Sequence, residues 1–134
     1  MHTYARNMTE NEIRNRAATA FDQAFDTGFL DACCDPVRSA IIRQLILLGK
    51  ADIGTIAKEF SQDRSVISRH LAVLERSGLV QSAREGRRVF YDLRGDVIMA
   101  RLQGLLEASK ALASICCPEV LAQETEREKT DVPG

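Results

Sequence analysis

The four cysteines of this 134-residue chain fall as two adjacent pairs, Cys33-Cys34 and Cys116-Cys117. Structural disulfides are uncommon in cytoplasmic proteins, so this pattern points toward metal or redox chemistry. Two neighbouring thiolates can bind one ion from a short segment, and a third thiolate would complete a trigonal site. Thiolates favour soft centres such as As(III), Sb(III), Cu(I), Cd(II) and Hg(II). Hard cations such as Mg²⁺ and Ca²⁺ are not expected, because the chain lacks clustered carboxylates.

The same thiols could instead form a dithiol switch for oxidants or reactive sulfur species. A helix N-terminus lowers the pKa of a nearby thiol, and Asp35-Pro36 predicts a helix start directly after the first pair. A free cysteine is more often a buried small hydrophobe, but two adjacent pairs at helix boundaries favour a function. A small dithiol oxidoreductase is disfavoured, because the chain has no Cys-x-x-Cys motif, no Ser/His/Asp set and no glycine-rich phosphate loop.

The elements that position these residues are predicted to be mostly helices. Apolar spacing predicts helices over about 9–30, 36–48, 52–60, 64–77 and 96–115, and two strands over 79–83 and 88–93 that flank a glycine-containing turn. The length suits one domain over residues 9–121, between a flexible N-terminus (1–8) and a polar C-terminal tail (122–134). Since the chain shows neither a spanning apolar run nor a secretory signal, we expect a cytoplasmic protein without membrane contact.

The third and fourth predicted helices are joined by a short turn, which is the proportion of a helix-turn-helix motif. Residues 64–94 hold seven arginines against three acidic residues, in a chain whose net charge is −1. Arginine suits both phosphates and guanine edges. The polar face of the fourth helix and the hairpin therefore predict a DNA-reading surface with a basic wing. Its candidate residues are Gln62, Arg64, Ser65, Ser68 and Arg69 on the helix side, and Arg84, Arg87 and Arg88 on the wing.

Several co-linear motifs between about residues 29 and 93 resemble the ArsR/SmtB family of metalloregulators. They are Asp35-Pro36-Val37-Arg38, Ile53-Gly54-Thr55-Ile56-Ala57, Ser65-Val66-Ile67-Ser68-Arg69-His70-Leu71, Leu74, Gly78-Leu79-Val80 and Glu85-Gly86-Arg87-Arg88-Val89-Phe90-Tyr91. The resemblance implies a mainly α winged helix-turn-helix fold with a β-hairpin wing, and a homodimer formed through the first and last helices. It also implies a repressor of an inverted-repeat operator in double-stranded DNA that an inducer releases. The DNA contacts it implies are Gln62, Ser65, Ser68, Arg69 and His70, with wing contacts at Arg87 and Arg88.

The chain departs from the sensor sites that are familiar in this family. Residues 51–60 contain no cysteine, so the arsenite and cadmium site of the third helix is absent. The last predicted helix has no histidine, which disfavours a zinc or nickel site. The sensor residues are therefore predicted to be Cys33, Cys34, Cys116 and Cys117. As(III) or Sb(III) is the leading inducer, because the family and an all-thiol site agree; another soft ion or a redox signal is the alternative. No obligatory cofactor is expected.

Overall fold

The computed structural model describes residues 8–25 and 28–130. The chain divides into two compact units, one of residues 26–101 and one that joins residues 1–25 to residues 102–134. The single domain expected over 9–121 therefore includes parts of both units. Residues 1–7 of the expected flexible N-terminus lie outside the described residues.

Capping residues begin the helices of the 26–101 unit. The Asp35 carboxylate accepts hydrogen bonds from the backbone N–H groups of Val37 and Arg38, and Pro36 occupies the first helical position. Asp52 accepts in the same way from the backbone N–H of Thr55. In order, the unit contains α2 (Phe29–Cys34), α3 (Pro36–Leu48), β1 (Ala51–Asp52), α4 (Ile53–Ala57), α5 (Arg64–Arg76), β2 (Val80–Glu85), β3 (Arg88–Leu93) and the first turns of α6 (Gly95–Cys116).

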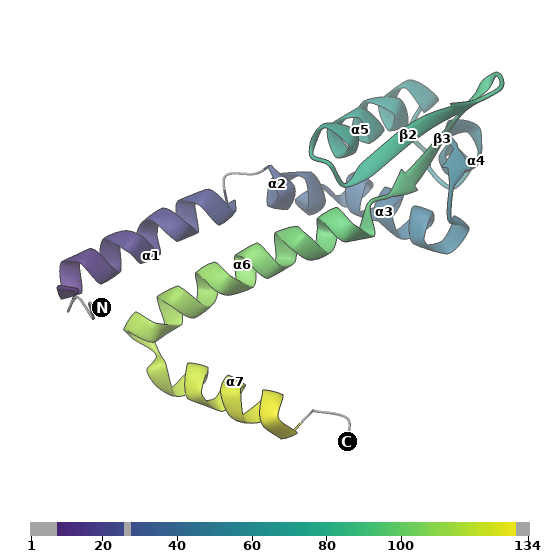
Figure 1. Cartoon of the computed structure of the whole chain (residues 1–134). Helices are drawn as coiled ribbons and strands as arrows, with labels where there is room; N and C mark the ends of the chain where they lie inside the picture. Colours follow the sequence, from purple (N-terminus) through teal and green to yellow (C-terminus); the bar gives the residue numbers. More distant parts are fainter. Residues whose placement is uncertain (1–7, 26–27, 131–134) are drawn as a thin grey trace. The chain divides into compact units, whose positions relative to one another are not determined.

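The three strands form an antiparallel sheet in the order β1-β3-β2. Figure 1 shows the hairpin of β2 and β3. The predicted hairpin is present, and its last pair is Glu85 with Arg88, so the turn has two residues. Gly86 holds the positive φ of 66° that such a turn requires. The short strand β1, which pairs Ala51 with Tyr91, was not predicted, because two residues carry no readable alternation.

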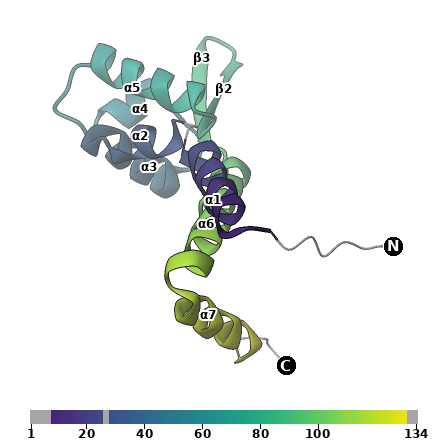
Figure 2. The same ribbon diagram turned by 90° about the vertical axis from the view of Figure 1, so that its left-hand side faces the viewer.

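Aliphatic side chains from α3, α4, α5 and the start of the hairpin make the core of this unit. Figure 2 shows these helices on one side of the hairpin, and each of the three contacts a hairpin strand. A core of Leu, Ile and Val fits a chain without Trp, and it fixes α5 by one face. The result is the predicted mainly α winged helix-turn-helix. The largest fully buried side chains are Ile41, Ile56, Ile67, Leu71, Leu74, Leu79 and Val80.

The first predicted helix is in fact two helices. Helix α1 (Glu10–Phe25) ends before Gly28, which has a left-handed backbone with φ 70° and directly precedes α2. Residues other than glycine seldom adopt that conformation, so the helical pattern is interrupted there. Cys33 and Cys34 consequently end a separate six-residue helix.

The second unit consists of α1, the part of α6 from Leu102 onward, and α7 (Pro118–Thr130). Helix α6 ends before Pro118, as predicted. The expected polar tail from 122 is polar and unburied, but to Thr130 it continues as helix α7, because Pro118 also suits a first helical position. None of the helices in the described ranges is long and apolar enough to cross a bilayer. The large apolar side chains exposed on this unit are Ile13, Phe21, Phe25, Leu102, Leu106, Leu112 and Val120.

Candidate nucleic-acid interface

The first half of α5 presents a polar face opposite its buried one. Ile67 and Leu71 are 0% exposed and hold the helix on the core. The predicted reading residues are mostly exposed on the other side, and Gln62 is half-buried in the turn before the helix. The exposed ones are Arg64, Ser65, Ser68 and Arg69.

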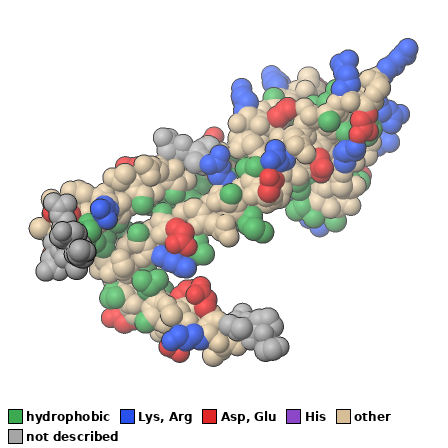
Figure 3. All heavy atoms as spheres, viewed as in Figure 1, with side chains coloured by type: hydrophobic (Ala, Val, Ile, Leu, Met, Phe, Trp, Pro, Cys, Tyr) green, Lys and Arg blue, Asp and Glu red, His purple; other side chains and the backbone are tan. Residues whose placement is uncertain are grey.

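The wing carries exposed arginines and is tied to the body of the unit. Lys50, in the loop after α3, forms an ion pair with Glu85 and lies over the ring of Phe90 at 5.4 Å. Through Lys50, these contacts join the loop after α3 to Glu85 of β2 and to Phe90 of β3. Figure 3 shows Lys and Arg side chains gathered around the hairpin and its tip. The three predicted wing residues, Arg84, Arg87 and Arg88, are all exposed.

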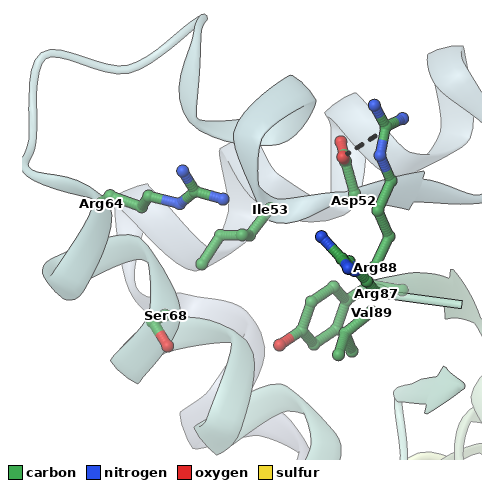
Figure 4. A pocket seen from close by; sticks show the side chains of 8 residues that line it. Asp52, Ile53, Arg64, Ser68, Arg87, Arg88 and Val89 are labelled. Carbon is green, nitrogen blue, oxygen red and sulfur yellow. Dashed lines mark ion pairs between the residues drawn. The ribbon is translucent and has the colours of Figure 1, made fainter. Parts of the chain in front are cut away.

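A cleft of about 300 Å³ lies between α5 and the wing. Figure 4 shows Arg64 entering it from α5, and Arg87 and Arg88 from the wing. Guanidinium groups and a hydroxyl are the donors that phosphate oxygens accept from, so the cleft suits a DNA backbone. The lining residues are Asp52, Ile53, Arg64, Ser68, Arg87, Arg88, Val89 and Tyr91.

The place of Asp52 in this cleft was not predicted from the sequence. Its carboxylate lies 3.8 Å from the Arg88 guanidinium, the contact dashed in Figure 4. Hydrogen bonds from Thr55 lower the pKa of Asp52, with smaller contributions from the charges of Arg88 and Arg64. Asp52 therefore stays charged and restrains Arg88. The β1–β3 pairing that brings these residues together had no sequence signal.

His70 is turned toward the junction of α2 and α3. Its Nδ1 lies 3.4 Å from Nη1 of Arg38 and 3.9 Å from a carboxylate oxygen of Asp35, and its side chain is 20% exposed. The DNA contact implied for His70 stays a prediction, and the described contacts of its Nδ1 are with protein groups. The contacts of Arg38 and Asp35 were missed, because they join residues more than thirty positions apart in the chain.

The pair Cys33-Cys34 lies at the C-terminal end of α2, with Cys33 half-buried and Cys34 exposed. Burial raises the pKa of the Cys33 thiol, the neighbouring Cys34 raises it further, and Arg38 partly opposes both. The helix start at Asp35-Pro36 is confirmed, but the expected lowering of thiol pKa is wrong for Cys33. Both cysteines belong to the preceding helix, so the start of α3 does not act on Cys33 as expected.

The pair Cys116-Cys117 lies at the junction of α6 and α7, and both thiols are exposed. The Cys117 thiol donates to the Cys116 sulfur at 3.3 Å. This hydrogen bond raises the pKa of Cys117, and the charges of Cys116 and Glu119 act in the same direction. Within either unit, the described residues gather no set of three or more His, Cys, Asp or Glu side chains suited to a metal ion.

A reading helix with a polar face, an arginine-bearing wing and a cleft between them define a winged helix-turn-helix transcriptional regulator. Comparison with known proteins gives the family: residues 35–82 match the model of the bacterial regulatory proteins of the ArsR family. The chain belongs to this family of transcriptional regulators.

Three relatives illustrate the likeness. The nodulation protein NolR of Rhizobium meliloti is 29% identical over 84 residues, which are 63% of this chain and 68% of NolR. The crystal structure of a possible transcriptional regulator for arsenical resistance is 32% identical, over 59% of this chain and 80% of that one, with a TM-score of 0.53. An ArsR-like transcriptional regulator from Rhodococcus sp. RHA1 is 26% identical, over 69% and 90%, with a TM-score of 0.58.

Proposed function

We propose that this ArsR-family regulator is a homodimeric repressor whose apo form binds an inverted-repeat operator. A thiophilic ligand, first of all As(III) or Sb(III), binds the cysteine thiols and releases the DNA. The DNA-binding part of this proposal rests on the cleft between α5 and the wing, which is lined by Arg64, Arg87 and Arg88. Three guanidinium groups beside a reading helix can donate to phosphate oxygens while the helix reaches base edges in the major groove.

The dimer is supported by the apolar side chains that the second unit leaves exposed. On α1, Phe21 and Phe25 stack at a centroid distance of 4.3 Å, yet are 44% and 40% exposed. On α6, Leu102 and Leu106 are 51% and 48% exposed. Large apolar side chains left exposed in this number are typical of a protein interface. A second copy also doubles the number of base pairs read, which a single recognition helix needs for useful specificity.

The ligand class is supported by the sulfur geometry at the α6–α7 junction. With Sγ atoms 3.3 Å apart, Cys116 and Cys117 can both reach one soft atom, since metal–thiolate bonds are about 2.3 Å long. Arsenical resistance is the role named for one of the relatives above. A third thiol from the other pair, or from a second copy, would complete a trigonal site.

The dithiol redox switch is the second candidate, favoured by the same sulfur contact. It requires a reactive thiolate, however, and the raised pKa values of Cys33 and Cys117 leave these thiols mostly protonated at neutral pH. A metalloid displaces the thiol proton as it binds, so it does not need a preformed thiolate. This difference places As(III) and Sb(III) ahead of oxidants.

A DNA-release titration tests the proposal. A fluorescent duplex selected in vitro by the protein is titrated with arsenite, antimonite, Cu(I), Cd(II), peroxide and polysulfide, and anisotropy reports the bound fraction. We expect release by arsenite and antimonite at low micromolar concentration, and loss of release when either cysteine pair is changed to serine. Release that persists in the variant without any thiol would refute a cysteine sensor, and failure to select any duplex would refute the DNA-binding role.

A further inference from the structure

One arginine side chain connects the end of α2 to the reading helix. Arg38, near the start of α3, donates from Nε to the carbonyl of Ala32 at 2.8 Å and from Nη2 to the carbonyl of Asp31 at 3.1 Å. Its third nitrogen, Nη1, lies 3.4 Å from Nδ1 of His70 on α5. A single planar group carried by α3 thus contacts two other helices of the same unit, and its two carbonyl partners directly precede Cys33-Cys34 in the chain.

From this arrangement we propose that Arg38 is a positioning residue, which sets α5 for DNA and passes on the state of the Cys33-Cys34 pair. The inference rests on the proposed function, in which ligand binding to the thiols releases DNA. The inference adds a route by which a ligand bound to α2 changes the position of α5, although α5 itself carries no cysteine.

Ligand binding at Cys33-Cys34 must deform α2. Successive residues of an α-helix point about 100° apart around its axis, because a turn holds 3.6 residues. One arsenic atom bound to both sulfurs therefore requires the last turn to unwind. That turn is easily changed, because a helix of six residues has little stability of its own. At Cys116-Cys117, by contrast, the second residue follows the end of α6 and the sulfurs are already 3.3 Å apart.

Deformation of that turn moves the acceptors of Arg38. Asp31 and Ala32 belong to the last four residues of α2, whose carbonyls have no partner within the helix. Arg38 satisfies both carbonyls, and its fork fits them only while they keep their helical spacing. When the turn unwinds, the guanidinium loses that geometry and must reorient.

Helix α5 responds because His70 shares the same guanidinium. An arginine can only donate, so Nδ1 of His70 is the acceptor in this contact. Asp35, which follows Cys34 and caps α3, lies 3.9 Å from the same nitrogen. In the sequence of α5, His70 follows the exposed Arg69 of the reading face and precedes the buried Leu71. A displaced Arg38 therefore acts on the segment of α5 that faces DNA.

The test isolates the first cysteine pair and measures coupling. In a Cys116→Ser/Cys117→Ser background, phenylarsine oxide can bind only Cys33 and Cys34. Each thiol gives up its proton, two As–S bonds form, the oxygen leaves as water, and arsenic keeps its oxidation state. Mass spectrometry confirms one phenylarsenic group per chain. The ratio of DNA dissociation constants with and without this group is the coupling factor.

Three proteins in this background are compared. The parent is expected to show a coupling factor of about ten or more, within the usual range for linked sites. Arg38→Lys keeps the charge but loses the planar fork, so its factor should fall below about two with the arsenical still bound. Arg43→Lys is the matched control, since Arg43 is exposed on the same helix and should keep the full factor. Hydrogen exchange of α5 amides should change on arsenical binding in the parent and control only.

The outcomes separate this inference from the proposed function. An unchanged coupling factor in Arg38→Lys overturns the role of Arg38 and leaves the proposed function standing. A background protein that does not respond, while the four-thiol protein does, also overturns it, because the signal then enters elsewhere. If the four-thiol protein binds DNA but no thiophile releases it, both the inference and the proposed function are refuted.

A second pair of variants covers the case in which Arg38→Lys does not fold. His70→Asn keeps an acceptor for the guanidinium near the position of Nδ1, whereas His70→Leu removes it. The inference expects the coupling factor to survive in the first and to fall below about two in the second. Equal factors in the two variants overturn the inference.

Discussion

Replacing Arg87 by glutamine should weaken DNA binding chiefly through its salt dependence. Arg87 follows Gly86 in the two-residue turn of the wing, is exposed, and lines the cleft with Arg64 and Arg88. Among the described residues no ion pair is recorded for it, whereas Arg88 lies near Asp52. Its charge is therefore available to a phosphate, and glutamine removes the charge while keeping a polar side chain of similar length.

The size of the effect follows from counterion release. Each neutralised phosphate contributes about −0.9 to the slope of log K against log salt concentration in B-DNA. A dimer loses two such contacts, so the slope should become shallower by about 1.8. Between about 50 and about 200 mM salt, the affinity advantage of the parent should shrink about twelvefold.

The measurement is a series of anisotropy titrations on one selected duplex at several salt concentrations. Arg127→Gln, on exposed α7, is the control and should keep the parental slope. If Arg87→Gln binds more weakly with the parental slope, the residue does not neutralise a phosphate. If both slope and affinity are unchanged, the wing is not part of the DNA interface.

The remaining predictions concern stability and thiol chemistry. Leu71→Ala truncates a side chain with 0% exposure and should cost about 2–5 kcal/mol in urea unfolding; a loss under about 1 kcal/mol would contradict the assigned core. Gly86→Ala should destabilise the protein by about 1 kcal/mol through its φ of 66° alone, since an added Cβ meets nothing within 4 Å, and Gly86→Asn should cost less; equal losses would argue against a left-handed turn. Because burial raises the pKa of Cys33, its thiolate is scarcer at neutral pH than that of an ordinary cysteine and becomes dominant only at higher pH. Mass spectrometry can follow its alkylation by iodoacetamide, whose midpoint pH should therefore lie above that of a cysteine peptide. A lower midpoint would favour the dithiol redox switch instead.

Local signals made much of the fold predictable. The start of α3 at Asp35-Pro36 and the glycine turn at Gly86 were both read from residue types whose backbone preferences act over a few positions. Periodic apolar residues likewise identified the buried face of α5. The break between α1 and α2 at Gly28 was not predicted, because one glycine inside a helical pattern does not reveal whether its φ is positive.

Contacts between distant residues were not predictable in the same way. The approach of Arg38 to His70 spans 32 positions, and that of Asp52 to Arg88 depends on the two-residue strand β1. Each side chain had an adequate local explanation, in a helix, a cap or a wing, so nothing in the sequence marked the pair. The candidate DNA-binding residues could therefore be named from the sequence, whereas the groups that position them could not.

The two cysteine pairs, which look alike in the sequence, differ in what a ligand must do to bind them. At Cys116-Cys117 the two sulfurs are already close together, so ligand binding there changes the backbone conformation little. At Cys33-Cys34 part of the binding free energy is used to unwind α2, which lowers affinity and, by linkage, is the part that can act on α5. The reading helix belongs to the same unit as Cys33-Cys34, and Cys116-Cys117 belongs to the other. Under the proposed function, a ligand that takes thiols from both pairs gains affinity from Cys116-Cys117 and releases DNA through Cys33-Cys34. Serine changes at either pair should therefore abolish release by low micromolar arsenite, but for different reasons: at Cys116-Cys117 they remove affinity for arsenite, and at Cys33-Cys34 they leave arsenite bound to a protein that holds its DNA.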